Sequence, residues 1–306
     1  MASESAAERP ALAAEVVPAQ VLAALALLTV MWGVNWPVMK LGLREMTPLM
    51  FRAVTMTGGF LVLFCWYRLR GARLALDRGE LLRVAALAAP NIVGWHALSI
   101  FGVAALASGR AAIVGFTMPI WTVLISVLLF GERMDRRIWF ATGCTALAVV
   151  MLLWHEFANF SGNPVGVAWM LAAAVNWATG TLLLKRVSLT ASTEALTLWM
   201  IGLAVPVFWG LALAFEPLPA LWPTTTGWVV LAYGALINYG IAQILWFSIA
   251  RRLPPAASAL SIMMIPLIGL GSAMPITGER PYAADYAAAI LILIALSAVL
   301  LVRRRS

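Results

Sequence analysis

The sequence carries very little charge for its length. Charged residues make up 11% of its 306 residues, whereas about a quarter of an average soluble domain is charged. Hydrophobic residues make up 63%, and the mean hydropathy is +0.92. So few polar groups cannot cover the surface of a water-soluble globule of this size. The composition therefore predicts a protein whose solvent is the lipid bilayer.

Cysteines and cofactor motifs are also scarce. Cys65 and Cys144 lie in or at the ends of apolar segments, which indicates neither a disulfide framework nor a metal site. The sequence has no His-Glu-x-x-His zinc motif and no Gly-x-x-x-x-Gly-Lys-Ser/Thr phosphate loop, so we expect no metal and no cofactor. The stretch "LASG" at 106–109 lacks the first glycine of a serine-protease turn. We therefore expect no enzyme activity.

Apolar runs of about 20 residues, the length of a membrane-crossing helix, occur ten times. They are continuous rather than alternating, which disfavours a lipid-facing β-barrel. The predicted fold class is an all-α integral membrane protein with ten transmembrane helices. The predicted spans are 19–40, 47–67, 81–103, 108–130, 136–154, 165–184, 194–215, 226–250, 255–277 and 283–302.

The basic residues indicate the orientation. With a cytoplasmic N-terminus, sixteen of the 21 lysines and arginines fall in cytoplasmic segments. The positive-inside rule then places both termini in the cytoplasm, with 1–18 a disordered tail and 303–306 a short tail. No basic face or nucleic-acid motif accompanies the net charge of +8, so no nucleic-acid partner is expected. The basic residues assigned to the other side are Lys40, Arg44, Arg52, Arg110 and Arg280.

One pattern occurs twice in the chain. The segment "FTMPIWTVLISVLLFGER" at 116–133 matches "MMIPLIGLGSAMPITGER" at 263–280. Pro119 and Pro266 each precede, by 12 residues, a glycine suited to close a helix in a left-handed conformation. Further matches are Asn91 with Asn238 and His96 with Gln243 at an offset of 147, and Trp32 with Trp177 and Lys40 with Lys185 at an offset of 145.

These matches predict a duplicated five-helix unit, with a first repeat at 19–155 and a second at 163–302. Because five is odd, the second copy must insert with the opposite topology. Two inverted five-helix repeats are typical of secondary transporters, whose substrate site lies near the bilayer midplane between the repeats.

The ten-span plan, the early "WGVNW" and the repeated Pro-x₁₁-Gly-Glu-Arg pattern resemble the drug/metabolite transporter superfamily, EamA type. The likeness covers the chain from about residue 19, and within the superfamily it is closest to the bacterial aromatic amino-acid exporters. The resemblance implies a multi-pass transporter of the bacterial inner membrane. It would export hydrophobic or aromatic amino acids and related metabolites by alternating access through a central cavity.

Polar and aromatic residues at membrane depth are the candidates for lining that cavity, because such groups usually face a cavity or another helix. On one helical face Lys40 follows Asn35 and Trp36 near the outer end, where it is interpreted as a snorkelling anchor. His96 could bind a carboxylate, relay a proton or bond to a neighbouring helix. The predicted lining residues are Asn35, Trp36, Asn91, Trp95, His96, Trp121, Trp177, Asn238, Tyr239 and Gln243.

Three prolines, Pro37, Pro119 and Pro266, are predicted hinges, because proline removes a helix hydrogen bond. None of the 13 acidic residues lies near the middle of a span, which disfavours carboxylate-driven antiport and permanently cationic solutes.

Aromatic rings and amides suit a neutral or zwitterionic solute with an apolar body, and no protein partner is required. Two alternatives stay open. One is an exporter of another neutral solute, such as a nucleobase, a sugar conjugate or a drug. The other is a membrane sensor or scaffold without transport, for which the short loops offer little docking surface.

Fusing alkaline phosphatase to the C-terminus tests the orientation. The enzyme needs disulfides, which form in the periplasm and not in the cytoplasm. We expect an inactive reporter at the C-terminus and an active one in the loop near residue 44. A strongly active C-terminal fusion would contradict the predicted topology.

Overall fold

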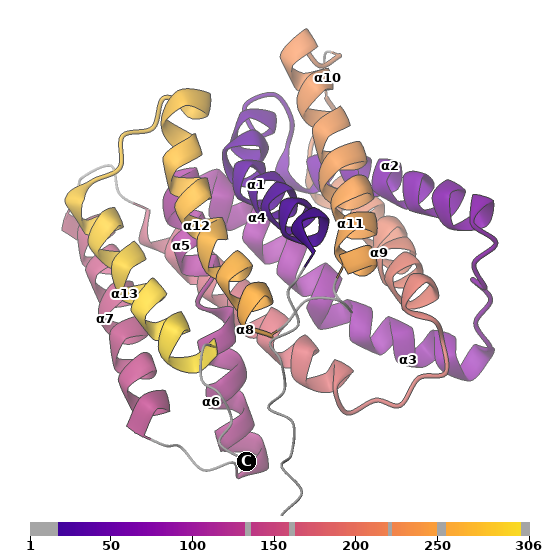
Figure 1. Ribbon diagram of the computed structural model, residues 1–306. Coiled ribbons are helices and arrows are strands. Elements are labelled where there is room, and N and C mark those ends of the chain that lie inside the picture. Colours follow the sequence, from indigo (N-terminus) through magenta and orange to yellow (C-terminus); the bar gives the residue numbers. More distant parts are fainter. Residues whose placement is uncertain (1–17, 132–135, 159–162, 220–221, 250–254, 301–306) are drawn as a thin grey trace, which may run out of the picture.

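The computed structural model describes residues 18–131, 136–158, 163–219, 222–249 and 255–300, and every regular element in these ranges is helical (Figure 1). The predicted tails lie outside these ranges, except for residue 18. The first-half elements are α1 (Ala19–Gly42), α2 (Pro48–Leu69), α3 (Arg78–Ala88), η1 (Ala89–Gly94), α4 (Trp95–Ala105), α5 (Ser108–Gly115), α6 (Met118–Phe130) and α7 (Arg136–Ala158). The second-half elements are α8 (Pro164–Leu184), α9 (Thr193–Phe215), α10 (Thr225–Ala232), η2 (Tyr233–Ile241), α11 (Ala242–Ile249), α12 (Pro255–Thr277) and α13 (Ala283–Leu300).

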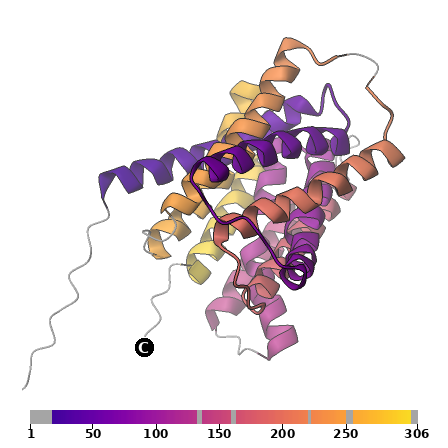
Figure 2. The same ribbon diagram turned by 90° about the vertical axis from the view of Figure 1, so that its right-hand side faces the viewer.

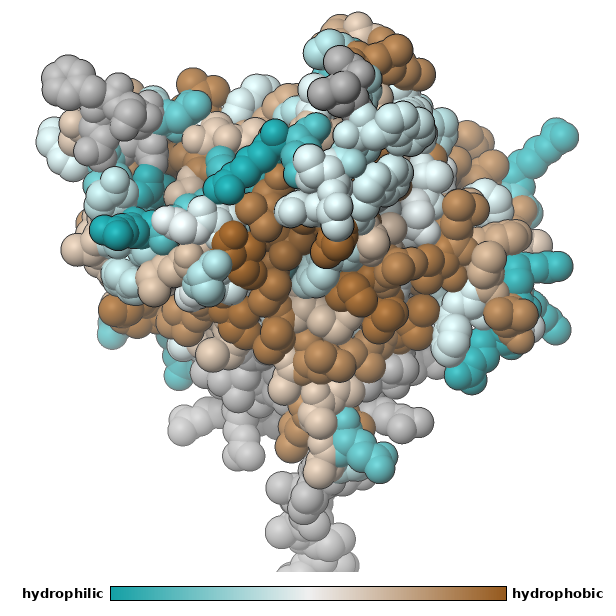
Figure 3. Space-filling view, turned by 90° about the horizontal axis from the view of Figure 1, so that it is seen from above, coloured by the Kyte–Doolittle hydropathy of each residue, from teal (hydrophilic) through white to brown (hydrophobic). Residues whose placement is uncertain are grey.

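The described residues contain eight helical runs long and apolar enough to cross a membrane, followed by two shorter apolar helices at 263–277 and 283–298. Each coincides with a predicted span. Large apolar side chains, such as Leu69, Leu128 and Phe215, are exposed on the outside. Apolar side chains also cover much of the face seen in Figure 3. Such a surface suits lipid rather than water.

A π-helical segment interrupts the third span of each half. η1 separates α3 from α4, and η2 separates α10 from α11. The residues matched in the sequence take equivalent places. Asn91 and Asn238 lie inside the π segments, while His96 and Gln243 are each the second residue of the next helix. Because π turns contain more residues than α turns, side chains within η1 and η2 do not follow α-helical spacing.

Helix contacts are exchanged between the two halves. α1 of the first half packs on α12 of the second half. In the same way its counterpart α8 packs on α5 and α6, which correspond to α12. α4 packs on α8, and its counterpart α11 packs on α1. Likewise α2 packs on η2, and its counterpart α9 packs on η1 and α3. Equivalent helices also meet: α2 packs on α9, and both lie toward the viewer in Figure 2, while α7 packs on α13 along one side of the molecule in Figure 1. Two units related by a two-fold axis would have this pattern of contacts.

The halves differ in their fourth spans. The first half has a break between α5 and α6, whereas α12 runs without interruption. Pro119 is the second residue of α6, directly after this break, while Pro37 and Pro266 are buried inside α1 and α12. The same proline pattern therefore accompanies two different backbone paths.

The glycines of the repeated pattern close their helices as predicted. Gly131 ends α6 with φ 67°, and Gly278 follows α12 with φ 73°. Both values lie in the left-handed region, where glycine avoids the clash that a Cβ would cause.

Carboxylates at the ends of spans hold neighbouring helices together. Each accepts hydrogen bonds from backbone N–H groups at the start of another helix, where these donors have no partner in their own helix. The contacts are Glu216 with the amides of Leu49 and Met50 (both 2.9 Å), Glu279 with the amide of Ser108 (2.8 and 2.9 Å) and Glu45 with the amide of Thr224 (2.9 Å).

Lys40 caps a helix, a role that its interpretation as a snorkelling anchor did not include. Its Nζ donates hydrogen bonds to the carbonyl oxygens of Val103, Ala104 and Leu106, each 2.8 Å away. These oxygens lie at the C-terminal end of α4, where a cation also interacts favourably with the helix dipole. The turn between α4 and α5 is therefore held by Lys40 on one side and by Glu279 on the other.

Replacing Lys40 with methionine tests this cap. Lys40→Met leaves three carbonyl oxygens without their charged donor, so we expect a loss of about 1–3 kcal/mol in the free energy of unfolding. Lys185→Met is the matched control, because Lys185 is the repeat counterpart and is exposed. Thermal unfolding in detergent measures both variants, and equal melting temperatures would contradict the cap.

Candidate functional site

Four aromatic residues form a tryptophan cluster, which consists of Trp36, Trp95, Phe116 and Trp177. The rings of Trp95 and Trp177 meet edge to face with centroids 5.5 Å apart, and those of Trp36 and Phe116 do so at 6.3 Å. The two pairs converge at Gly115, where an added Cβ would lie 3.1 Å from Trp36 and 3.4 Å from Trp95. The cluster therefore surrounds the break between α5 and α6.

Four other residues form an arginine cluster, which consists of Arg52, His96, Ser99 and Tyr239. Arg52 lies one turn into α2 and is 3% exposed. Its Nε donates to the backbone oxygen of His96 (3.3 Å), Nη1 to the Tyr239 hydroxyl (3.1 Å) and Nη2 to the Ser99 hydroxyl (3.3 Å). One guanidinium thus joins α2, α4 and η2.

His96 connects the two clusters, because it follows Trp95 directly in α4. Its ring lies 5.5 Å from that of Tyr239, and its Nδ1 is 2.9 Å from the backbone oxygen of Ile92. A carbonyl oxygen can only accept, so this contact places a proton on Nδ1. The neutral ring then has Nε2 as its acceptor.

Small residues bring η2 close enough to α2 for this arrangement. A Cβ added to Gly59 would overlap the Cβ of Tyr239, and one added to Gly234 would lie 2.7 Å from Thr55. Glycine at such contacts lets helix backbones approach closely in a membrane. The position of Tyr239 against Arg52 therefore depends on glycines in both helices.

The remaining predicted lining residues belong to neither cluster. Asn91 is buried and donates to the backbone oxygen of Leu87 (3.0 Å), and Trp121 donates through Nε1 to the Thr117 hydroxyl (3.1 Å). The other three are half-buried, and they are Asn35 in α1, Asn238 in η2 and Gln243 in α11.

Sequence reasoning missed three members of the clusters, Arg52, Ser99 and Phe116. Arg52 was counted only in the charge tally, among the basic residues of the non-cytoplasmic side, whereas its side chain is buried inside the helical bundle. A signal for it was present, since Arg52 falls within the predicted span 47–67. Serine and phenylalanine are ordinary residues in an apolar helix, so Ser99 and Phe116 carried no such signal.

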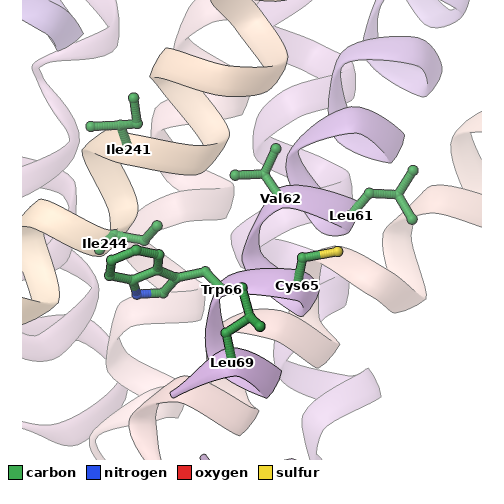
Figure 4. A pocket seen from close by; sticks show the side chains of 7 residues that line it. All are labelled: Leu61, Val62, Cys65, Trp66, Leu69, Ile241 and Ile244. Atoms are coloured by element: carbon green, nitrogen blue, oxygen red, sulfur yellow. The ribbon is translucent and has the colours of Figure 1, made fainter.

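Two grooves on the surface of the described residues share no lining residue with either cluster. One lies between α2 and the η2–α11 segment and is lined only by apolar side chains and a cysteine (Figure 4), namely Leu61, Val62, Cys65, Trp66, Leu69, Ile241 and Ile244. A lining of this kind matches lipid chains. Polar groups that could orient a solute lie instead in the arginine cluster.

A family model described as the EamA-like transporter family matches residues 20–154 and again residues 164–301. The chain belongs to the EamA-like transporter family. This EamA-like chain is therefore a multi-pass transmembrane transporter. The two matched segments run close to the two predicted repeats.

Relatives of this EamA-like transporter carry similar descriptions. It is 27% identical over 257 residues to the uncharacterized inner membrane transporter YedA of Escherichia coli, covering 84% of this chain and 82% of that one. It is 26% identical over 281 residues to a probable amino-acid metabolite efflux pump of E. coli, covering 87% and 90%. A solved crystal structure, described only as that of a protein, shares the fold with a TM-score of 0.63 at 20% identity, over 92% of this chain and 98% of that one.

Substitution of Gly59 tests the close approach of α2 and η2. Gly59→Ala forces the helices apart, and we expect the free energy of unfolding to fall by about 1–3 kcal/mol. Gly210→Ala is the matched control, because a Cβ there meets no atom within 4 Å. Thermal unfolding in detergent compares the two, and an unchanged melting temperature for Gly59→Ala would contradict the contact.

Proposed function

We propose that the protein exports hydrophobic or aromatic amino acids and related small metabolites across the bacterial inner membrane. One observation carries this proposal. The tryptophan and arginine clusters adjoin through Trp95 and His96, and each includes a residue of the second half, Trp177 and Tyr239 respectively. Together they offer aromatic surface for an apolar body next to polar groups for a charged or polar end.

Alternating access would follow from the position of the clusters between the halves. The exchanged helix contacts, the paired π segments and the two family matches support two inverted repeats of five helices. Rocking of one repeat against the other would break and remake contacts such as Trp95 with Trp177. Pro37, Pro119 and Pro266 are the proposed hinges. Both termini would lie in the cytoplasm.

The substrate class follows from the chemistry of the clusters and from the relatives. A relative described as a probable amino-acid metabolite efflux pump spans nearly the whole chain, which supports amino acids and their derivatives. The predicted lining residues outside the clusters, such as Asn238 and Gln243, would add amide groups for the polar end of the solute. No protein partner is part of this proposal.

Uptake of labelled phenylalanine by proteoliposomes tests the function. We expect saturable uptake above that of empty vesicles, and His96→Ala should reduce it several-fold because the ring packs on Tyr239 between the halves. His155→Ala is the matched control, since His155 lies in α7 and packs on Tyr282.

The outcomes separate the alternatives. No saturable flux across a panel of amino acids would remove this substrate class. Transport of a nucleobase, sugar conjugate or drug instead would favour another solute. Co-purification of a partner without counterflow would favour a sensor or scaffold.

A further inference from the structure

Two buried arginines of the protein have very different surroundings. Arg110 is 5% exposed and pairs with the buried carboxylate of Asp285, at 2.7 Å from Nε and 3.1 Å from Nη2. Arg52 is 3% exposed, yet no carboxylate of the described residues lies within ion-pair distance of it. Its three hydrogen-bond acceptors are a carbonyl and two hydroxyls, all of them neutral. Arg52 therefore brings an unbalanced positive charge into the bundle.

An unbalanced buried charge is unfavourable unless it serves another purpose. Guanidinium does not lose its proton in proteins, so Arg52 cannot relieve the burial by becoming neutral. Hydrogen bonds to neutral groups replace part of its hydration but leave the charge without a counter-ion. A neutral side chain would fill this position at lower cost. The arginine is therefore suited to an anion that is not part of the chain.

The two terminal nitrogens of the Arg52 guanidinium can exchange their present acceptors for those of a ligand. Nε is held by the backbone oxygen of His96, which fixes the direction of the group. The two terminal nitrogens donate only to the hydroxyls of Tyr239 and Ser99. Hydroxyls rotate and can donate as well as accept. A carboxylate could take their place on both terminal nitrogens while they turn to donate to its oxygens, which is the bidentate arrangement arginine favours.

We infer that Arg52 binds the carboxylate of the transported solute and so makes a free carboxylate a requirement for transport. This inference rests on the proposed function and specifies its substrate class. The tryptophan cluster begins at Trp95, one residue from the His96 oxygen that holds Arg52. The solute is therefore a small molecule with a carboxylate at one end and an apolar or aromatic body at the other. Amides of such solutes, and amines that lack a carboxylate, are excluded.

Competition between phenylalanine and phenylalaninamide tests the inference. The amide keeps the ring and the amine but replaces the carboxylate with a neutral group. In proteoliposomes with labelled phenylalanine, we expect unlabelled phenylalanine to compete about 10- to 100-fold better than the amide, the effect of charge-assisted hydrogen bonds. Arg52→Gln should weaken phenylalanine and make the two competitors nearly equal, while Arg52→Lys should retain part of the preference.

A control variant and a binding measurement distinguish failure of the carboxylate inference from failure of the proposed function. Arg44→Gln removes an exposed arginine that donates to the backbone oxygen of Thr277, and it should keep the wild-type preference. If Arg52→Gln is folded but does not transport, equilibrium binding of labelled phenylalanine in detergent, with the same competitors, gives the preference directly. Uptake with an unchanged preference in Arg52→Gln, or equal competition in the wild type, overturns the inference alone. Absence of amino-acid uptake by the wild type overturns the proposed function as well.

Discussion

At membrane depth every polar group must find its partner within the protein, because no water is present to supply one. Much of the structure follows from this constraint. Glu216, Glu279 and Glu45 satisfy backbone amides at the starts of helices, and Lys40 satisfies three carbonyl oxygens at the end of one. The charged residues near the span ends thus act as ties between helices, which short loops alone could not provide.

The same constraint sets Arg52 apart. Arg110 shares the interior with its counter-ion, as a structural buried charge does, and both members lie near the start of their helices. Among the residues that the structure describes, Arg52 has only neutral partners, and it lies where α2, α4 and η2 meet. This helix junction also joins the two sequence halves, so any movement of one half against the other would change the surroundings of the guanidinium. The proposed solute carboxylate gives the charge its missing counterpart.

Periodicity and repetition in the sequence predicted a large part of the fold. The apolar runs located the helices to within a few residues, because a bilayer demands continuous apolar helices of nearly constant length. Matched residues such as His96 and Gln243 occupy equivalent places after the two π segments. Gly131 and Gly278 close their helices as the pattern predicts. The π segments themselves were not predicted, because no residue pattern distinguishes their wider turns from α turns.

The sequence by itself determined that the chain is a helical membrane protein, because hydropathy acts along the chain, and its repeat spacing predicted two related halves. It also placed His96, Trp95, Trp177 and Tyr239 among the residues of interest. Only the tertiary structure decided which of them meet. Arg52 and Tyr239 are 187 positions apart and come together through glycine contacts between α2 and η2. Helix packing alone sets such pairings, because neighbouring helices in space need not be neighbours in the chain.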